Sequence, residues 1–185
     1  MNYSPKRWCG AKVMIDTNAI NARQANIYLN QIEAWRASGT IQLLMPEVAY
    51  EEALAGDDRR REEKAGKQVR GRAHRVTADQ QKRRDLIERV LFPRGASTES
   101  QRNDVEIVYQ AAAWSSILVT SDGASRRQRR GILGSRLELA EMEIVVMPPA
   151  ELVAHVRDLV ARRDARVLKV CGARKLHVPS WVGAD

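Results

Sequence analysis

Four short apolar runs, separated by segments of helical character, constrain the fold of this chain more than any other feature. Between the runs, apolar residues recur at the three- and four-residue spacing of a helix that buries one face. Strands joined through helices pair in parallel, because a parallel pair needs a long crossover connection. The sequence therefore predicts an α/β fold, a three-layer α/β/α sandwich with a mainly parallel central sheet. The runs are KVMI at 12–15, IQLL at 41–44, ILVT at 117–120 and IVVM at 144–147.

The helical segments have recognisable ends. Ser38-Gly39 stops the first pattern, Pro46 suits the first turn of the second, and Pro148-Pro149 opens the last. Towards the end of the chain, the sequence of residues 167–170 predicts a short edge strand. The predicted helices cover 19–37, 47–55, 105–114, 133–142 and 149–163.

Residues 57–97 interrupt this pattern as an insertion within a single predicted domain over 1–185. Between 57 and 94 the chain carries 13 Lys and Arg against seven Asp and Glu, a net charge of +6. This composition predicts a basic helical hairpin that binds nucleic acid. A solvated helical surface with i,i+4 ion pairs accounts for the same composition, and both interpretations stay open. The insertion arginines predicted to contact RNA are Arg59, Arg60, Arg61, Arg70, Arg72 and Arg75.

The charge balance of the 185 residues favours a polyanionic partner. The chain has 31 Lys and Arg against 23 Asp and Glu, a net charge of +8. No apolar run approaches the ~18 residues that span a bilayer, and no apolar stretch follows the first residues as in a secretion signal. Cys9 and Cys171 are too far apart for a zinc motif. We expect a cytoplasmic protein that binds RNA rather than a membrane, with Trp35 and Trp114 in its core or in a homodimer interface.

Acidic residues follow three of the predicted strands. Asp16 comes directly after the first, Glu51 and Glu52 lie in the helix after the second, and Asp122 stands two positions after the third; Asp104 opens another helix. Because parallel strands place their carboxyl ends at one edge, these side chains could converge there. Clustered carboxylates need a cation, and oxygen ligands without His or Cys favour Mg²⁺ or Mn²⁺. Taken singly, Asp16 and Asp104 also suit helix N-caps.

Four segments resemble the acidic motifs of the PIN domain in order and in strand context. The resemblance spans residues 12–163 outside the insertion. The four segments are VMIDTNAI at 13–20, PEVAYEEA at 46–53, NDVEIVYQAA at 103–112 and LVTSD at 118–122. It implies a metal-dependent nuclease, usually one that acts on RNA, in which Asp16, Glu52, Asp104 and Asp122 hold the metal and carry catalysis.

The resemblance also assigns supporting roles. Asn18 and Thr120 match the polar residues that orient the aspartates, and Glu51 is the fallback for Glu52. Ala124 stands where many members of the family have a further acid, which weakens the case for a tightly held second metal.

Arginines close to the fourth aspartate suit a phosphate clamp, with a solvated helix end as the alternative. They are Arg126, Arg127, Arg129 and Arg130.

The leading interpretation is an endoribonuclease that hydrolyses RNA phosphodiesters, similar to VapC-type toxins, which a small antitoxin protein neutralises. A PIN-type nuclease acting in RNA processing or on structured DNA is an alternative. A phosphohydrolase of the haloacid dehalogenase type expects an aspartate where Asn18 stands. A basic RNA-binding module without catalysis is the remaining reading, in which the acids are caps and surface residues.

Overall fold

The computed structural model describes residues 5–20, 24–55, 58–66, 69–71, 77–123 and 131–185. It contains a five-stranded sheet in the order β3-β2-β1-β4-β5, with every pairing parallel. The predicted α/β class is therefore confirmed. The strands are β1 (Lys12–Ile15), β2 (Gln42–Pro46), β3 (Val69–Gly71), β4 (Ile117–Val119) and β5 (Val146–Met147).

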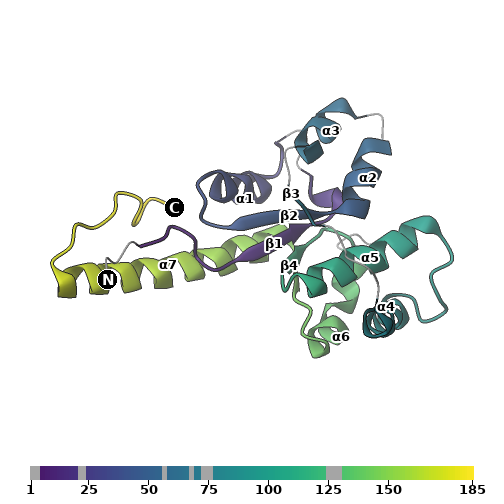
Figure 1. Cartoon of the computed structure of the whole chain (residues 1–185). Coiled ribbons are helices and arrows are strands. Elements are labelled where there is room, and N and C mark those ends of the chain that lie inside the picture. The colour runs from purple at the N-terminus through teal and green to yellow at the C-terminus, as the bar shows by residue number, and fades with distance from the viewer. Residues whose placement is uncertain (1–4, 21–23, 56–57, 67–68, 72–76, 124–130) are drawn as a thin grey trace.

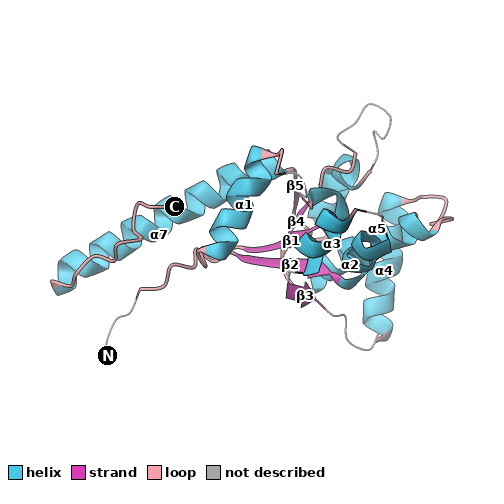
Figure 2. Cartoon of the chain, turned by 90° about the horizontal axis from the view of Figure 1, so that it is seen from above, coloured by secondary structure: helices cyan, strands magenta, loops and turns pink. Residues whose placement is uncertain are grey.

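Helices lie on both sides of this sheet (Figures 1 and 2). On one side α1 packs against α7, and on the other α4 packs against α5. The described helices are α1 (Ile27–Ala37), α2 (Glu47–Ala55), α3 (Arg59–Gly66), α4 (Ala78–Leu91), α5 (Glu99–Ala113), α6 (Arg136–Glu141) and α7 (Pro149–Arg174). Two short 3-10 helices, η1 (Thr17–Ala19) and η2 (Ile132–Ser135), complete the described elements.

Burial on both faces explains why the strands are continuous apolar runs. Val13, Met14 and Leu118 are fully buried within the sheet. Parallel strands covered by helices on both sides lack the polar face that an antiparallel sheet turns to water. The same pairing aligns the strand ends, since Ile15 of β1 lies opposite Val119 of β4. The residues that follow β1 and β4 consequently leave the sheet side by side.

The predicted helical hairpin in the insertion is wrong in one respect. β3 lies between α3 and α4 and extends the sheet, with Val69 opposite Leu44 of β2. The free edge of β2 offers unpaired backbone groups that such a strand satisfies. The two helices are also tied to the body: Lys64 Nζ of α3 lies 2.8 Å from Glu33 Oε1 of α1, and Ile87 of α4 is fully buried.

The edge strand predicted at 167–170 is also wrong, because α7 continues through it to Arg174. Val160, Val167 and Cys171 are buried at helical spacing, so the apolar residues of this segment belong to a helical stripe. Other positions of α7 carry exposed charged residues, among them Glu151, Arg157 and Arg162. No helix in the described ranges is long and apolar enough to cross a membrane.

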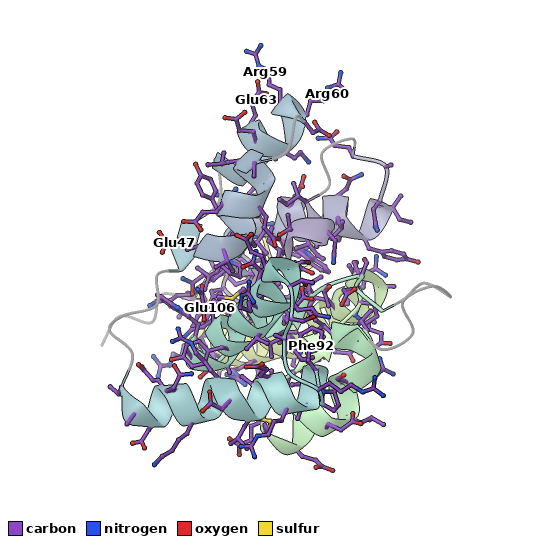
Figure 3. All side chains as sticks on the ribbon, turned by 90° about the vertical axis from the view of Figure 1, so that its right-hand side faces the viewer. Glu47, Arg59, Arg60, Glu63, Phe92 and Glu106 are labelled. Carbon is purple, nitrogen blue, oxygen red and sulfur yellow. The ribbon has the colours of Figure 1, made fainter. Side chains whose placement is uncertain are left out.

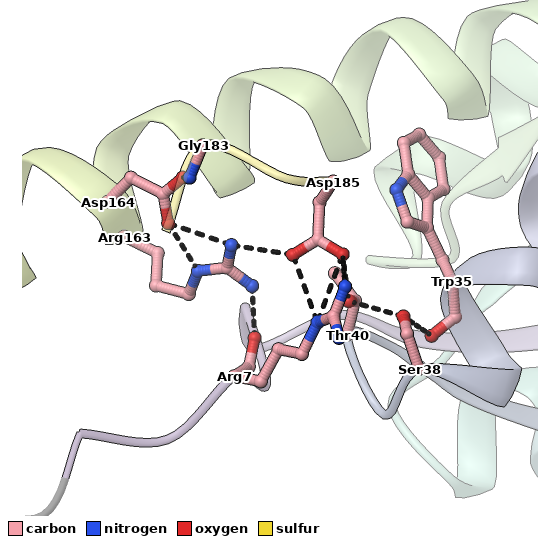
Figure 4. A network of polar contacts seen from close by, with 8 residues as sticks. All are labelled: Arg7, Trp35, Ser38, Thr40, Arg163, Asp164, Gly183 and Asp185. Atoms are coloured by element: carbon pink, nitrogen blue, oxygen red, sulfur yellow. Dashed lines mark hydrogen bonds and ion pairs between the residues drawn. The ribbon is translucent and has the colours of Figure 1, made fainter. Parts of the chain in front are cut away.

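A buried ionic network fastens the end of the chain to the body (Figure 4). The Asp185 side chain is only 1% exposed and accepts hydrogen bonds from Arg163 Nη2 at 2.8 Å and Thr40 Oγ1 at 2.8 Å. Arg7 Nε donates to it at 3.1 Å. Burial alone raises the pKa of Asp185, but these hydrogen bonds outweigh it and hold the pKa below its ordinary value. Arg163 also stacks over Trp181, 4.7 Å from the ring centre.

Asp185→Ala should destabilise the fold by about 2–3 kcal/mol, because Arg163, Arg7 and Thr40 would all lose the buried carboxylate that they share, although Arg163 keeps its ion pair with Asp164. Glu151→Ala is the control, since Glu151 forms an exposed ion pair with Arg136 and should cost less than about 1 kcal/mol. Urea unfolding of the two variants measures both values. Equal losses would show that the network is no stronger than a surface ion pair.

Candidate functional site

Asp16 and Asp122 stand where β1 and β4 end, at the carboxyl edge of the sheet. Asp16 directly follows β1, and its backbone N–H donates to Val119 O of β4 at 3.1 Å. Asp122 lies three residues after β4. The parallel register of the two strands thus sets both predicted acids at one edge. Asp16 is 4% exposed, which is rare for a carboxylate.

The Asp16 carboxylate accepts hydrogen bonds from the two predicted positioning residues and from the next backbone N–H. Asn18 Nδ2 donates to Oδ2 at 2.6 Å and Thr120 Oγ1 donates to the same oxygen at 2.7 Å. Thr17 N donates to Oδ1 at 2.5 Å. Asp16 also caps η1, so the capping interpretation and the site interpretation apply to the same residue.

Glu52, rather than Glu51, faces the other acids. Its carboxylate accepts hydrogen bonds from Thr17 Oγ1 at 2.6 Å and from Asn103 Nδ2 at 2.6 Å. Glu51 is exposed to solvent. The two neighbours diverge because adjacent helical residues point about 100° apart. Thr17 and Asn103 were not singled out from the sequence, although each adjoins a predicted acid.

Asp104 does not open its helix, which corrects the N-cap alternative. Thr98 caps α5, and Thr98 and Gln101 form a reciprocal capping box. Asp104 therefore lies in the second turn. Its carboxylate accepts no hydrogen bond from any residue in the described ranges. Burial raises the pKa of Asp104 to about 7, and the negative charges of Asp122, Asp16 and Glu52 add to the shift.

Asp122 is held by the backbone around it. Thr120 Oγ1 accepts from Asp122 N at 2.9 Å, and Asp122 Oδ2 accepts from Ile132 N at 2.7 Å. Gly131 approaches so closely that a Cβ added there would overlap the Asp122 carboxylate. The contacts with Gly131 and Ile132 come from a segment nine and ten residues further along the chain, and no pattern in the sequence signals them.

The four acids influence one another electrostatically. Burial raises the pKa of Asp16, and the charges of Asp122 and Glu52 raise it further, against hydrogen bonds from Thr120 and Thr17. Among the described residues, no three His, Cys, Asp or Glu side chains are grouped so as to hold a metal ion. The donor chemistry nevertheless suits a hard divalent cation, because all four groups are carboxylates and the Asp104 carboxylate lacks a described partner.

The predicted RNA-binding arginines are only partly visible. Arg126, Arg127, Arg129 and Arg130 lie outside the described residues, as do Arg72, Arg75 and the side chains of Arg61 and Arg70.

Arg59 and Arg60 are exposed and project from α3 into solvent (Figure 3). Arg59 Nε lies 3.3 Å from Glu63 Oε1, an i,i+4 ion pair of the kind that the alternative reading of the insertion expects. Contact of either arginine with RNA stays a prediction.

Comparison with known proteins adds little to this geometry. No model of a known protein family matches the chain, and no curated protein matches it. Among solved structures, VapBC2 from Rickettsia felis bound to a promoter DNA fragment is 14% identical, with a TM-score of 0.46, and covers 74% of this chain and 98% of that chain. FitAB bound to an IR36 DNA fragment is 14% identical, with a TM-score of 0.41, and covers 74% and 94%. Likenesses of this size carry no inference, so the resemblance to the PIN domain stays a prediction.

Asp104→Asn should flatten the pH dependence of stability in metal-free protein. The folded-state pKa is about 7, against an ordinary value of 3.8, so the folded chain keeps a proton that the unfolded chain releases. The free energy of unfolding then falls as pH rises from about 4 to 7. The variant cannot ionise there, and above pH 7 it should melt a few degrees higher than the wild type.

Thermal melting from pH 4 to 8 in EDTA tests this, with Asp79→Asn as the control because Asp79 is exposed and lies beside Lys82. A variant that kept the wild-type pH profile would show that the Asp104 carboxyl ionises normally.

Proposed function

We propose that this protein is a Mg²⁺- or Mn²⁺-dependent endoribonuclease that hydrolyses RNA phosphodiester bonds. One observation carries the proposal: Asp16 and Asp104 lie with Asp122 and Glu52 at one edge of the sheet, and the charges of Asp122 and Glu52 raise the pKa of both Asp16 and Asp104. A fold gains nothing from burying mutually repelling carboxylates unless their charge is used. A divalent cation that binds these carboxylates and contacts an RNA phosphate would use it.

The four acids share one task in this proposal, and neighbouring residues orient them. Asp16, Glu52, Asp104 and Asp122 would hold the cation, which supplies a nucleophilic water at neutral pH and neutralises charge at the phosphate. Asn18 and Thr120 fix the orientation of the Asp16 carboxylate through their hydrogen bonds. Thr17 and Asn103 hold Glu52 by one oxygen each. Such outer hydrogen bonds set ligand direction and commonly change metal affinity when they are lost.

The substrate class follows from charge. The net charge of +8 favours a nucleic acid, and we propose RNA, with Arg59, Arg60 and the other arginines of the insertion as phosphate contacts. The toxin of a toxin–antitoxin pair, inhibited by a small antitoxin protein, is the biological setting that we propose. A homodimer is part of the same proposal.

One observation favours a second candidate, a basic RNA-binding module without catalysis. In the part of the chain that the structure describes, no three potential ligands are already grouped around a common point. Both Glu52 oxygens are occupied by hydrogen bonds from neighbouring side chains. In this candidate the acids stabilise turns and helix contacts, and RNA binding does not depend on them.

Asp16→Asn and Glu52→Gln should each lower cleavage of single-stranded RNA at least 100-fold, because each removes a charged ligand at nearly constant volume. Glu51→Gln is the matched control, one residue away but exposed, and should cleave like the wild type. The assay follows labelled RNA with Mg²⁺, with Mn²⁺ and with EDTA, and the products should carry 5′-phosphates.

Affinity for RNA and melting temperature are measured on the same samples. Wild-type RNA binding without cleavage under any metal condition would favour the binding module. Cleavage that survives both EDTA and Asp16→Asn would exclude the metal-dependent mechanism.

A further inference from the structure

We propose that α7 carries a second RNA-binding surface, remote from the four acids, formed by Arg162, Arg166 and Lys169. These three residues are called the α7 stripe below. The occupant is the phosphate backbone of RNA, so the identity of the polyanion rests on the proposed function. The stripe lies outside both the arginine-rich insertion and the segment after Asp122, so it is separate from the phosphate contacts proposed above.

The stripe occupies one face of a regular helix. Arg162, Arg166 and Lys169 are spaced four and three residues apart, which places their side chains above one another along α7. All three are exposed. The opposite side of the helix is apolar and buried, as Val160 and Val167 show. The helix therefore turns a row of cations towards solvent and keeps it there by burying its other face.

The cations of the stripe are not neutralised by neighbours. Within the described ranges, none of the three forms an ion pair; Arg162 Nε donates instead to the backbone oxygen of Asp158 at 3.2 Å. The end of the chain leaves the stripe open, because its contacts with α7 lie on another side. Trp181 stacks on the buried Arg163 and Gly183 N donates to Asp164 Oδ2 at 2.8 Å. A row of unpaired cations fits a regularly spaced polyanion.

The position of the stripe fixes how long a bound RNA must be. α7 begins after β5 at the carboxyl edge of the sheet, near the acids, and runs back past the opposite ends of the strands (Figures 1 and 2). At ~1.5 Å per residue, the stripe lies about 20–30 Å along the helix from its first residue. Stacked nucleotides advance ~3.4 Å each, so an RNA must exceed roughly six to nine nucleotides to reach both surfaces.

The test measures binding of a 30-nucleotide single-stranded RNA in EDTA, where no cleavage intervenes. The variant replaces Arg162, Arg166 and Lys169 with alanine. Three lost phosphate contacts should reduce the slope of log affinity against log salt by about 2, at ~0.7 per contact for single strands. A five-nucleotide RNA is too short to span both surfaces, so the same variant should lower its affinity less than that of the 30-nucleotide RNA.

A scattered triple variant serves as the matched control. Lys6, Lys12 and Arg136 are exposed cations outside α7 and outside the insertion, and their replacement with alanine removes the same net charge. An equal loss of slope in both variants would show that only total charge matters, and would overturn the proposal. So would an unchanged slope in the stripe variant, or a loss of binding to phosphatidylserine vesicles without a loss of RNA binding.

Failure of the proposed function leaves a different signature. Wild-type protein that binds the 30-nucleotide RNA through the stripe, yet never cleaves it with Mg²⁺ or Mn²⁺, would remove the nuclease and retain the α7 surface. Melting temperature is recorded for both triple variants, and circular dichroism confirms that α7 stays helical. A reduced slope in a folded stripe variant therefore reports lost phosphate contacts.

Discussion

The repulsion among one buried and three half-buried carboxylates at the carboxyl edge of the sheet is the constraint on which the rest of the structure depends. Asp16 is almost completely buried, and burial together with the charges of Asp122 and Glu52 raises its pKa. Hydrogen bonds to its charged form oppose this rise and fix the direction of the carboxylate. Thr120 and Asn18 supply those bonds from two different strand ends, so the site is also a joint between β1 and β4.

The insertion supports this site from a distance, because it holds the helix that carries Asp104. Arg84 of α4 stacks over Tyr109 at 4.2 Å and donates to Glu106 Oε1 at 3.0 Å, both on α5. Gln110 extends the link, donating to Glu106 at 3.0 Å and accepting from Glu47 N of α2 at 3.4 Å. The basic insertion, which the sequence predicts to bind RNA, therefore also holds α5 in place. α5 in turn contacts α2, the helix that carries Glu52.

The sequence predicts most of the sheet and locates the acids, for a physical reason. Strands buried on both faces are apolar throughout, so KVMI and ILVT are easily recognised in the sequence. Because these strands pair in parallel, the acids that follow them lie at the same edge of the sheet. β3 could not be predicted in this way, because Val69–Gly71 contains no apolar run. It forms a strand because it pairs with the free edge of β2. The contacts of Asp122 with Ile132, and of Glu52 with Asn103, depend on tertiary packing that no local pattern encodes.

The separation of acids and cations along the molecule follows from how far charges act in salt solution. At physiological ionic strength, charges more than about 8 Å apart in solvent are largely screened. The α7 stripe lies about 20–30 Å back along its helix. At that distance its positive charges do not relieve the repulsion among the acids, and the negative charges of the acids do not weaken the attraction of the stripe for a polyanion. The acids therefore need a counter-charge close to them. The Asp104 carboxylate is available to bind one, because no described residue donates a hydrogen bond to it. In the two proposals, attraction of RNA and handling of its phosphate are separate functions, the first carried by α7 and the second by the acids at the carboxyl edge of the sheet.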